Sequence, residues 1–265
     1  MKRLLVLLFS ILISFNSLGE TGCSEKDDKE DFINSTTYFQ ERGGLLYLPN
    51  QSKPYSGENL CIHKNSSGQY FLKGEIKNGK RHGKMTIWQK NGLIDGELYF
   101  KDGEAVGDTI YEYYYSTDQI KSVKNNKLVI KDGIQSYMKD GKWTEWFENG
   151  QKVAERTYKD DKEDGKVTMW YENGQKAAEG TYKDGQSFGK QTGWYENGQK
   201  QIEVIWKDGQ PFGKNTRWHE NGQKHAEGNM KDGKLNGKWT SWNEDGQINF
   251  VANYEDGECI SGDCD

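Results

Sequence analysis

The sequence predicts an all-β protein: an elongated, single-layer meander of antiparallel β-hairpins, built from about eight units of 24 residues. Three observations support this fold class. Near-identical segments recur at a fixed step of 24 residues, and Asn-Gly or Asp-Gly turn signals separate short alternating segments. Only 33% of the 265 residues are hydrophobic, and 32 glycines accompany 3 prolines, which suits short strands joined by tight turns better than a thick core.

Tryptophan marks the repeat. A segment that reads Trp-Tyr-Glu-Asn-Gly-Gln-Lys, with small variations, begins at five positions that are 24 residues apart, and an earlier unit has a matching tryptophan. Such a period is typical of stacked repeats, in which each unit buries its apolar side against its neighbours. We interpret these residues as packing residues; the alternative is a row of rings that contacts a glycan. They are Trp88, Trp146, Trp170, Trp194, Trp218 and Trp242.

The loop in each unit decides which side chains share a face of the sheet. If Glu-Asn-Gly forms a three-residue loop with its glycine in the left-handed region, Trp146 pairs with Lys152 and Thr144 lies opposite Ala154. We expect this arrangement because it gathers the large recurring apolar groups on one face, away from Glu155. The residues expected to share that face are Thr144, Trp146, Ala154 and Tyr158, with their counterparts in later units. The segment 111–131 is longer and degenerate, which predicts a bend or an insertion.

The repeating units resemble a known family. The pattern Gly-Lys-x-Thr-x-Trp-Tyr-Glu-Asn-Gly-Gln-Lys-x-Ala-Glu-Gly-x-Tyr-Lys-Asp-Gly, with the opening segment Gly44 to Gly57, is similar to the MORN repeat variant of bacterial proteins often labelled YwqK-type antitoxins. The resemblance covers roughly residues 43–257. It implies a β-hairpin repeat sheet and a role in interactions, and it brings no catalytic residues.

Charge and side-chain chemistry exclude several function classes. The chain has 36 basic and 41 acidic residues, a net charge of −5, and therefore lacks the basic footprint of a nucleic-acid-binding protein. Its four histidines do not recur from unit to unit, and no nucleophile with a base, phosphate loop or metal-ligand spacing recurs. We therefore expect a protein that is not an enzyme and has no catalytic residues, metal site or cofactor.

The N-terminus predicts export. Met1 to Gly19 has a basic start, an apolar run and small residues before a cleavage position, as in a signal peptide. We expect the mature protein in the periplasm, on the cell surface or secreted. The predicted segments are a signal peptide at 1–19, a charged flexible linker at 20–42, an opening segment or cap at 43–56, repeats at 57–257 and a tail at 258–265.

The four cysteines predict disulfides, because an even number in an exported chain is typical of paired thiols. We expect a bond between Cys259 and Cys264 in the tail and a second between Cys23 and Cys61. The alternative for Cys23 is lipidation, which would anchor the mature chain to a membrane.

These observations favour a scaffold that binds a protein partner outside the cytoplasm. The alternatives are an adhesin for a glycan or lipid surface, and an antitoxin-like protein that neutralises an exported toxin. If the constant positions serve packing, recognition belongs to positions that differ between units, which we expect on the face of the sheet that carries the glutamates. The candidate binding residues are Trp143, Phe147, Met169, Tyr171, Tyr195, Arg217 and Trp239.

Overall fold

The computed structural model describes residues 22–25, 40–48, 50–65, 68–89, 91–114, 118–131 and 134–264. The predicted signal peptide, most of the predicted linker and Asp265 lie outside the described residues. The described residues form β-strands and no helix, so the predicted all-β hairpin repeat is confirmed. They divide into an N-terminal part, within residues 1–106, and a C-terminal part, within residues 107–265.

The N-terminal part is an antiparallel sheet and a separate small hairpin. Strand β1 pairs with β4, and β4, β5, β6 and β7 then pair in chain order, whereas β2 pairs with β3. One face carries a buried cluster of Leu72, Met85, Ile87, Leu98 and Phe100. The strands are β1 (Gly22–Glu25), β2 (Gln40–Arg42), β3 (Leu45–Tyr47), β4 (Gly57–Asn65), β5 (Gly68–Lys77), β6 (Lys80–Trp88) and β7 (Ile94–Lys101).

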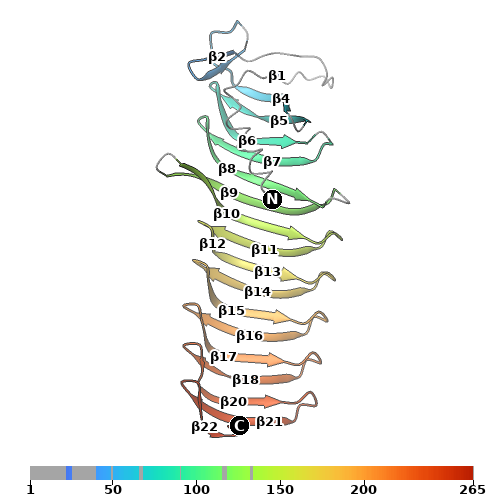
Figure 1. Ribbon diagram of the computed structural model, residues 1–265, viewed down its shortest axis with the longest axis vertical. Coiled ribbons are helices and arrows are strands. Elements are labelled where there is room, and N and C mark those ends of the chain that lie inside the picture. Colours follow the sequence, from blue (N-terminus) through green and yellow to red (C-terminus); the bar gives the residue numbers. More distant parts are fainter. Residues whose placement is uncertain are drawn as a thin grey trace. The chain divides into compact units, whose positions relative to one another are not determined.

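The C-terminal part continues with strands that pair antiparallel in chain order, and Figure 1 follows them from β9 to β22. Strand β8 (Glu104–Tyr113) crosses the division between the two parts and pairs with β9. The other strands are β9 (Ile120–Lys131), β10 (Ile134–Trp146), β11 (Lys152–Lys159), β12 (Lys162–Glu163), β13 (Gly165–Trp170), β14 (Lys176–Lys183), β15 (Gln186–Trp194), β16 (Lys200–Lys207), β17 (Gln210–Trp218), β18 (Lys224–Lys231), β19 (Lys234–Leu235), β20 (Gly237–Trp242), β21 (Ile248–Glu255) and β22 (Glu258–Gly262).

The loop between β10 and β11 has three residues, as predicted. Gly150 has a φ of +84°, and the Phe147 amide donates a 2.7 Å hydrogen bond to the Gln151 carbonyl, which closes the loop around Glu-Asn-Gly. Trp146 then pairs with Lys152, also as predicted. The same loop recurs in the following units, where the equivalent glycines have φ values of +84°, +85°, +84° and +81°.

The predicted sharing of one face was wrong, because a β-bulge follows each loop. Val153 has no partner on β10, so Glu145 lies opposite Ala154 and Thr144 lies opposite Glu155. One extra residue on one strand reverses the facing of every side chain beyond it. The bulge recurs beside the other loops, between Met169 and Trp170 for example, and therefore sets the faces throughout the C-terminal part.

The two faces have different compositions. The small-residue face carries Ala154, Arg156, Tyr158 and their counterparts; Ala154 is 1% exposed and Ala252 is fully buried. The glutamate face carries Glu155, Thr144 and their counterparts. On that face each glutamate pairs with two lysines, as Glu155 does with Lys142 at 2.8 Å and Lys152 at 2.6 Å, and the pKa of the Glu155 carboxyl is lowered by these hydrogen bonds.

Side chains of the loops join successive units. In the loop that contains Asn173, the side-chain oxygen accepts from the Gln175 amide at 2.9 Å, while the side-chain nitrogen donates to the Glu196 carbonyl in the next loop at 2.9 Å. Tyr171, two residues before Asn173, adds a second bridge, because its hydroxyl donates to the Trp194 carbonyl at 2.7 Å. Equivalent asparagine bridges start from Asn149, Asn197 and Asn221.

The degenerate segment contributes to a longer hairpin, which agrees with the insertion that the sequence predicted as one of two alternatives. β9 and β10 contain 12 and 13 residues, against 8 in β11 or β14. The register of β9 with β10 shifts between Lys139 and Trp143, so the extra length is accommodated before the regular repeat begins. The end of this hairpin exposes Ile130 and Ile134.

Replacement of Asn173 tests the bridge between loops. Asn173→Ala removes the acceptor within its own loop and the donor to the next loop. We expect the free energy of unfolding to fall by about 1–2 kcal/mol, measured by urea denaturation. Glu172→Ala is the matched control, because its backbone is unchanged and its side chain is exposed. Equal stability of the two variants would contradict a structural role for the asparagine.

The backbone of β1 and β4 makes the second disulfide testable. The register sets Cys23 opposite Cys61 in an antiparallel pair, where Cα atoms lie close enough for a disulfide. We expect the intact mass of the chain to rise by the mass of two hydrogen atoms on reduction of this bond, after allowance for Cys259–Cys264. A lipid mass on Cys23 together with a free Cys61 thiol would contradict the prediction.

Candidate functional site

Several predicted binding residues lie on the face opposite to the expected one. Trp143, Met169, Arg217 and Trp239 belong to the small-residue face, since they pair with Arg156, Ala178, Ala226 and Ala252. The bulge beside each loop explains this correction. Trp239 is only 8% exposed and lies over Gly228, where an added Cβ would approach the indole ring to 2.0 Å. Trp239 is therefore a packing residue.

The other predicted binding residues lie at the loops. Tyr171 and Tyr195 donate from their hydroxyl groups to the carbonyls of Trp194 and Trp218, at 2.7 and 2.8 Å. Phe147 begins its loop and pairs with Gln151 through the backbone. The two tyrosines thus join neighbouring units, a role that the sequence did not distinguish from partner binding, whereas the Phe147 bond closes its own loop.

The recurring tryptophans are half-buried on the glutamate face. Each ring from Trp170 onward lies near a lysine of the preceding unit; for example, the Lys152 ammonium is 5.5 Å from the centre of the Trp170 ring. The same lysine pairs with Glu155, which joins the ring, the cation and the carboxylate. Equivalent contacts are made by Lys176 with Trp194, Lys200 with Trp218 and Lys224 with Trp242.

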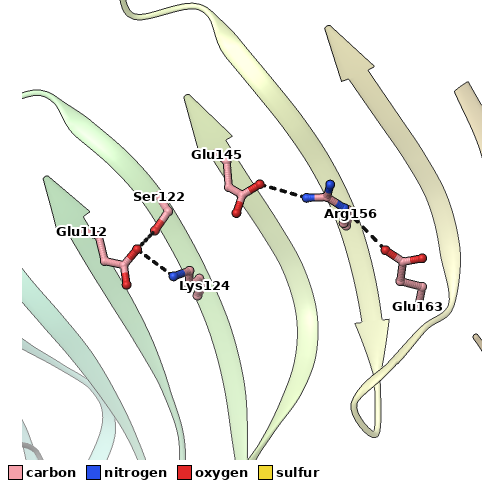
Figure 2. Close-up of polar contacts among 6 residues, drawn as sticks. All are labelled: Glu112, Ser122, Lys124, Glu145, Arg156 and Glu163. Carbon is pink, nitrogen blue, oxygen red and sulfur yellow. Dashed lines mark hydrogen bonds and ion pairs between the residues drawn. The ribbon is translucent and has the colours of Figure 1, made fainter. Parts of the chain in front are cut away.

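A cluster of charged side chains interrupts the small-residue face where the long hairpin meets the regular repeat. Figure 2 shows it crossing successive strands from β8 to β12. Glu145 accepts from Arg156 at 2.9 Å, and the other side of the Arg156 guanidinium lies 3.5 Å from Glu163. We call this set, with the second group below, the charge cluster; its members are Glu112, Ser122, Lys124, Glu145, Arg156 and Glu163.

The second group in the charge cluster centres on Glu112. Its carboxylate accepts from the Ser122 hydroxyl at 2.6 Å and from the Lys124 ammonium at 2.7 Å. Burial raises the pKa of the Glu112 carboxyl, but the hydrogen bonds from Lys124 and Ser122 outweigh that effect and leave the pKa below its usual value. Glu112 is therefore a charged, satisfied acceptor at neutral pH.

Beside the charge cluster, two aromatic rings hold a lysine. The Trp143 and Tyr158 ring centres are 5.1 Å apart, and the Lys139 ammonium lies 4.6 and 4.8 Å from them. The Trp143 indole nitrogen donates to the Asn125 carbonyl at 2.7 Å, which fixes the ring. Lys139 has no carboxylate partner among the described residues, so its positive charge remains available on this face.

A buried acid lies on the same face of β8. Asp108 is 3% exposed, accepts a 2.8 Å hydrogen bond from Asn126, and has a pKa raised by burial to about 6. Tyr137 lies on β10, and burial and the nearby Asp108 raise its pKa to about 12. Neither residue was predicted from the sequence, because their burial depends on the neighbouring strands rather than on a local pattern.

Two histidines on either side of one loop are in contact in the structure. The rings of His219 and His225 are 4.5 Å apart, and His219 bonds to the Trp242 carbonyl at 2.8 Å in place of a loop tyrosine. Burial, His219 and Arg217 lower the pKa of the His225 imidazole. The described part of the chain contains no group of three His, Cys, Asp or Glu side chains suited to a metal ion.

Cys259 and Cys264 are joined by a disulfide, with their Cα atoms 5.6 Å apart, and this bond closes the tail beyond β21.

Within the described ranges, no helix is long and apolar enough to cross a membrane.

Replacement of the buried acid gives a pH-dependent prediction. Because folding raises the Asp108 pKa from 3.8 to about 6, the folded chain holds this proton more tightly than the unfolded chain. Stability conferred by this group is present below pH 4 and is lost as pH rises through about 6. Asp108→Asn should therefore stabilise the fold at pH 7 by up to about 3 kcal/mol and have little effect below pH 4. Denaturation at both pH values measures this, and an equal effect at both would contradict it.

Comparison with known proteins matches part of the chain to a repeat family model. No curated protein matches the chain. Among solved structures, the chain is similar to one described as "Crystal Structure of TcdB2-TccC3" (9% identity, TM-score 0.20, 81% of this chain and 16% of that chain). A second, "Crystal Structure of TcdB2-TccC3-Cdc42", has 9% identity and a TM-score of 0.17 over 78% of this chain and 15% of that chain. The chain thus spans less than a fifth of either one. Four segments match the family model described as the MORN repeat variant: residues 139–160, 163–184, 189–208 and 235–256.

Proposed function

We propose that this protein is an exported, non-enzymatic scaffold that binds a protein partner through its small-residue face. The observation that supports this most is the Lys139 ammonium, held on the Trp143 and Tyr158 rings without a carboxylate of its own. A cation that is positioned in advance by two rings suits an acidic group on a partner. The matches to the MORN repeat variant agree with a repeat scaffold.

The charge cluster supports recognition better than catalysis. Glu112, Glu145 and Arg156 each have a partner of opposite charge, so none is a free base or acid aimed at a substrate. Arg156 and Lys124 are each 23% exposed, and Glu145 is 40% exposed. Half-buried ion pairs of this kind give a surface a specific pattern of charge, which selects partners more than it strengthens binding.

The recurring tryptophans do not favour the glycan-binding alternative. Their rings are half-buried and lie against lysines of the preceding unit, as at Lys152 and Trp170. A ladder of fully exposed rings would suit sugars, whereas covered rings support a packing role. Neutralisation of an exported toxin remains compatible with a protein-binding scaffold, and a toxin would then be the partner.

Removal of the Lys139 charge tests the proposed function. Lys139→Met keeps an apolar stem against the two rings but removes the ammonium. We expect thermal unfolding to change little and capture of the partner from envelope fractions to fall at least about tenfold, the usual effect of losing a charge-assisted contact.

Lys142→Met is the matched control, because Lys142 lies three residues away on the glutamate face and is 55% exposed. It should capture the partner as well as the unaltered chain does. Undiminished capture by Lys139→Met, or loss in the control alone, would contradict binding through the small-residue face.

A further inference from the structure

The long hairpin leaves part of β10 with an open edge. Pairing of β10 with β9 runs from Ile134 to Lys139 without a shift in register, whereas pairing of β10 with β11 begins only at Gly141. Figure 1 shows the end of this hairpin projecting beyond the ends of β11 to β14. Among the described residues, no strand therefore lies beside Ile134 to Met138 on the β11 side.

The contacts of Lys139 show which backbone groups face this open edge. Its amide donates to the Asp161 carboxylate at 2.7 Å, and its carbonyl accepts from the Asp161 amide at 3.0 Å. Asp161 lies in the turn after β11, so the backbone groups of Lys139 point away from β9. Because alternate residues of a strand direct these groups to the same side, the N–H and C=O groups of Tyr137 and Gln135 also face the open edge.

Asp161 pairs with Lys139 as a neighbouring strand would, and the pairing stops there. The outward backbone groups of Tyr137 and Gln135 have no hydrogen-bond partner in the described chain, and each residue offers one donor and one acceptor. Natural sheets commonly protect such an edge with a charged residue or a proline, but the segment 134–138 contains neither. This edge therefore has the backbone groups that a further strand would need.

A cation lies beside the same edge. The Lys139 side chain is on the same face of β10 as those of the two outward residues, because the three alternate along an unshifted strand. Its ammonium reaches the Tyr158 ring on β11, so the side chain leans toward the side where an added strand would lie. The nearby carboxylates of Asp140 and Asp160 pair with Lys127 instead. A strand with an acidic side chain would complement this edge in both backbone and charge.

Taking the proposed scaffold function as its basis, we propose that the open edge of β10 binds an extended segment of the protein partner as an added β-strand, with an acidic side chain of that segment against Lys139. The backbone of the added strand pairs with Tyr137 and Gln135. In this mode of recognition main-chain hydrogen bonds supply affinity, and side chains at alternate positions supply specificity. An acidic residue opposite Tyr137 is diagonal to Lys139, a separation that two long side chains can span.

The opposite edge of the same hairpin provides an internal comparison. Pairing of β8 with β9 ends at Lys127, so Leu128 and Ile130 also direct their backbone groups to an edge that β8 does not cover. Lys139 leans away from that edge, which therefore lacks the charge held by the rings. Ile130 lies directly opposite Gln135, so the same substitution can be made on either edge.

The test uses the full purified chain and two peptides of equal length. Acetyl-Thr-Val-Glu-Val-Thr-amide carries an acidic residue, and acetyl-Thr-Val-Gln-Val-Thr-amide is its neutral match. Binding is followed by the ¹H–¹⁵N resonance of the Tyr137 amide. We expect a saturable shift at millimolar concentrations, with an affinity about fivefold higher for the acidic peptide. Methylation of the glutamate nitrogen in the acidic peptide removes a backbone donor and should weaken binding at least about tenfold.

Proline variants assign the contact to one edge. Gln135→Pro removes the outward N–H and puts the proline ring on the open edge, where proline leaves the pairing with β9 intact. It should weaken binding of the acidic peptide at least about tenfold. Gln135→Ala keeps the backbone, and Ile130→Pro puts the same block on the opposite edge, so both should bind as the unaltered chain does. The amide resonances of the regular repeats report whether each variant is folded.

The added strand would be overturned by the absence of a saturable shift, by an unchanged affinity in Gln135→Pro, or by binding that survives methylation of the peptide. Equal affinity for the two peptides would overturn the acidic side chain. A molar mass that rises with concentration in light scattering, and does not rise in Gln135→Pro, would assign the edge to a second copy of the chain instead. Partner capture that survives in Gln135→Pro but is lost in Lys139→Met removes the added strand and leaves the scaffold function standing.

Discussion

In the regular units of the C-terminal part, the side chain of the loop asparagine holds one repeat to the next along one edge of the sheet. Its oxygen closes its own Glu-Asn-Gly loop, and its nitrogen reaches the following loop, as Asn173 does to the Glu196 carbonyl. Both functions need an amide. The loop that carries Asp245 keeps only the first, since its carboxylate accepts from the Gln247 amide but has no hydrogen to donate. In this sequence no further Asn-Gly loop follows it.

This fixed loop has a consequence for the rest of the sheet. The bulge beside it sends alanine, glycine and tyrosine positions to one face and the lysine and glutamate positions to the other. The glutamate face is therefore a repeated pattern of ion pairs, almost the same from unit to unit. Variation between units gathers on the small-residue face, where Trp143, Asn215 and Trp239 occupy equivalent positions. A face that combines packing with variation offers the means to distinguish one partner from another.

The sequence predicted those features of the fold and the candidate site that depend only on neighbouring residues. The hairpins, the three-residue loops and the pairing of Trp146 with Lys152 follow from a few neighbouring residues, so the sequence was sufficient. The facing of Thr144 was predicted wrongly, because the bulge at Val153 has no signal of its own and depends on how the strand fits its neighbour. Asp108 and Lys139 were missed because neither the burial of one aspartate nor the ring contacts of one lysine can be read from the neighbouring residues. The sequence did single out Arg217, although for the opposite face.

The claim that partners bind the small-residue face can be measured most directly by chemical modification of lysines in the complex. Lys139 and Lys142 are close in sequence but belong to opposite faces, so one acetylation experiment with mass spectrometry compares them within the same chain. We expect the bound partner to protect Lys139 from acetylation while Lys142 reacts as fast as in the free protein. Protection of Lys142 with an unchanged rate at Lys139 would contradict the account.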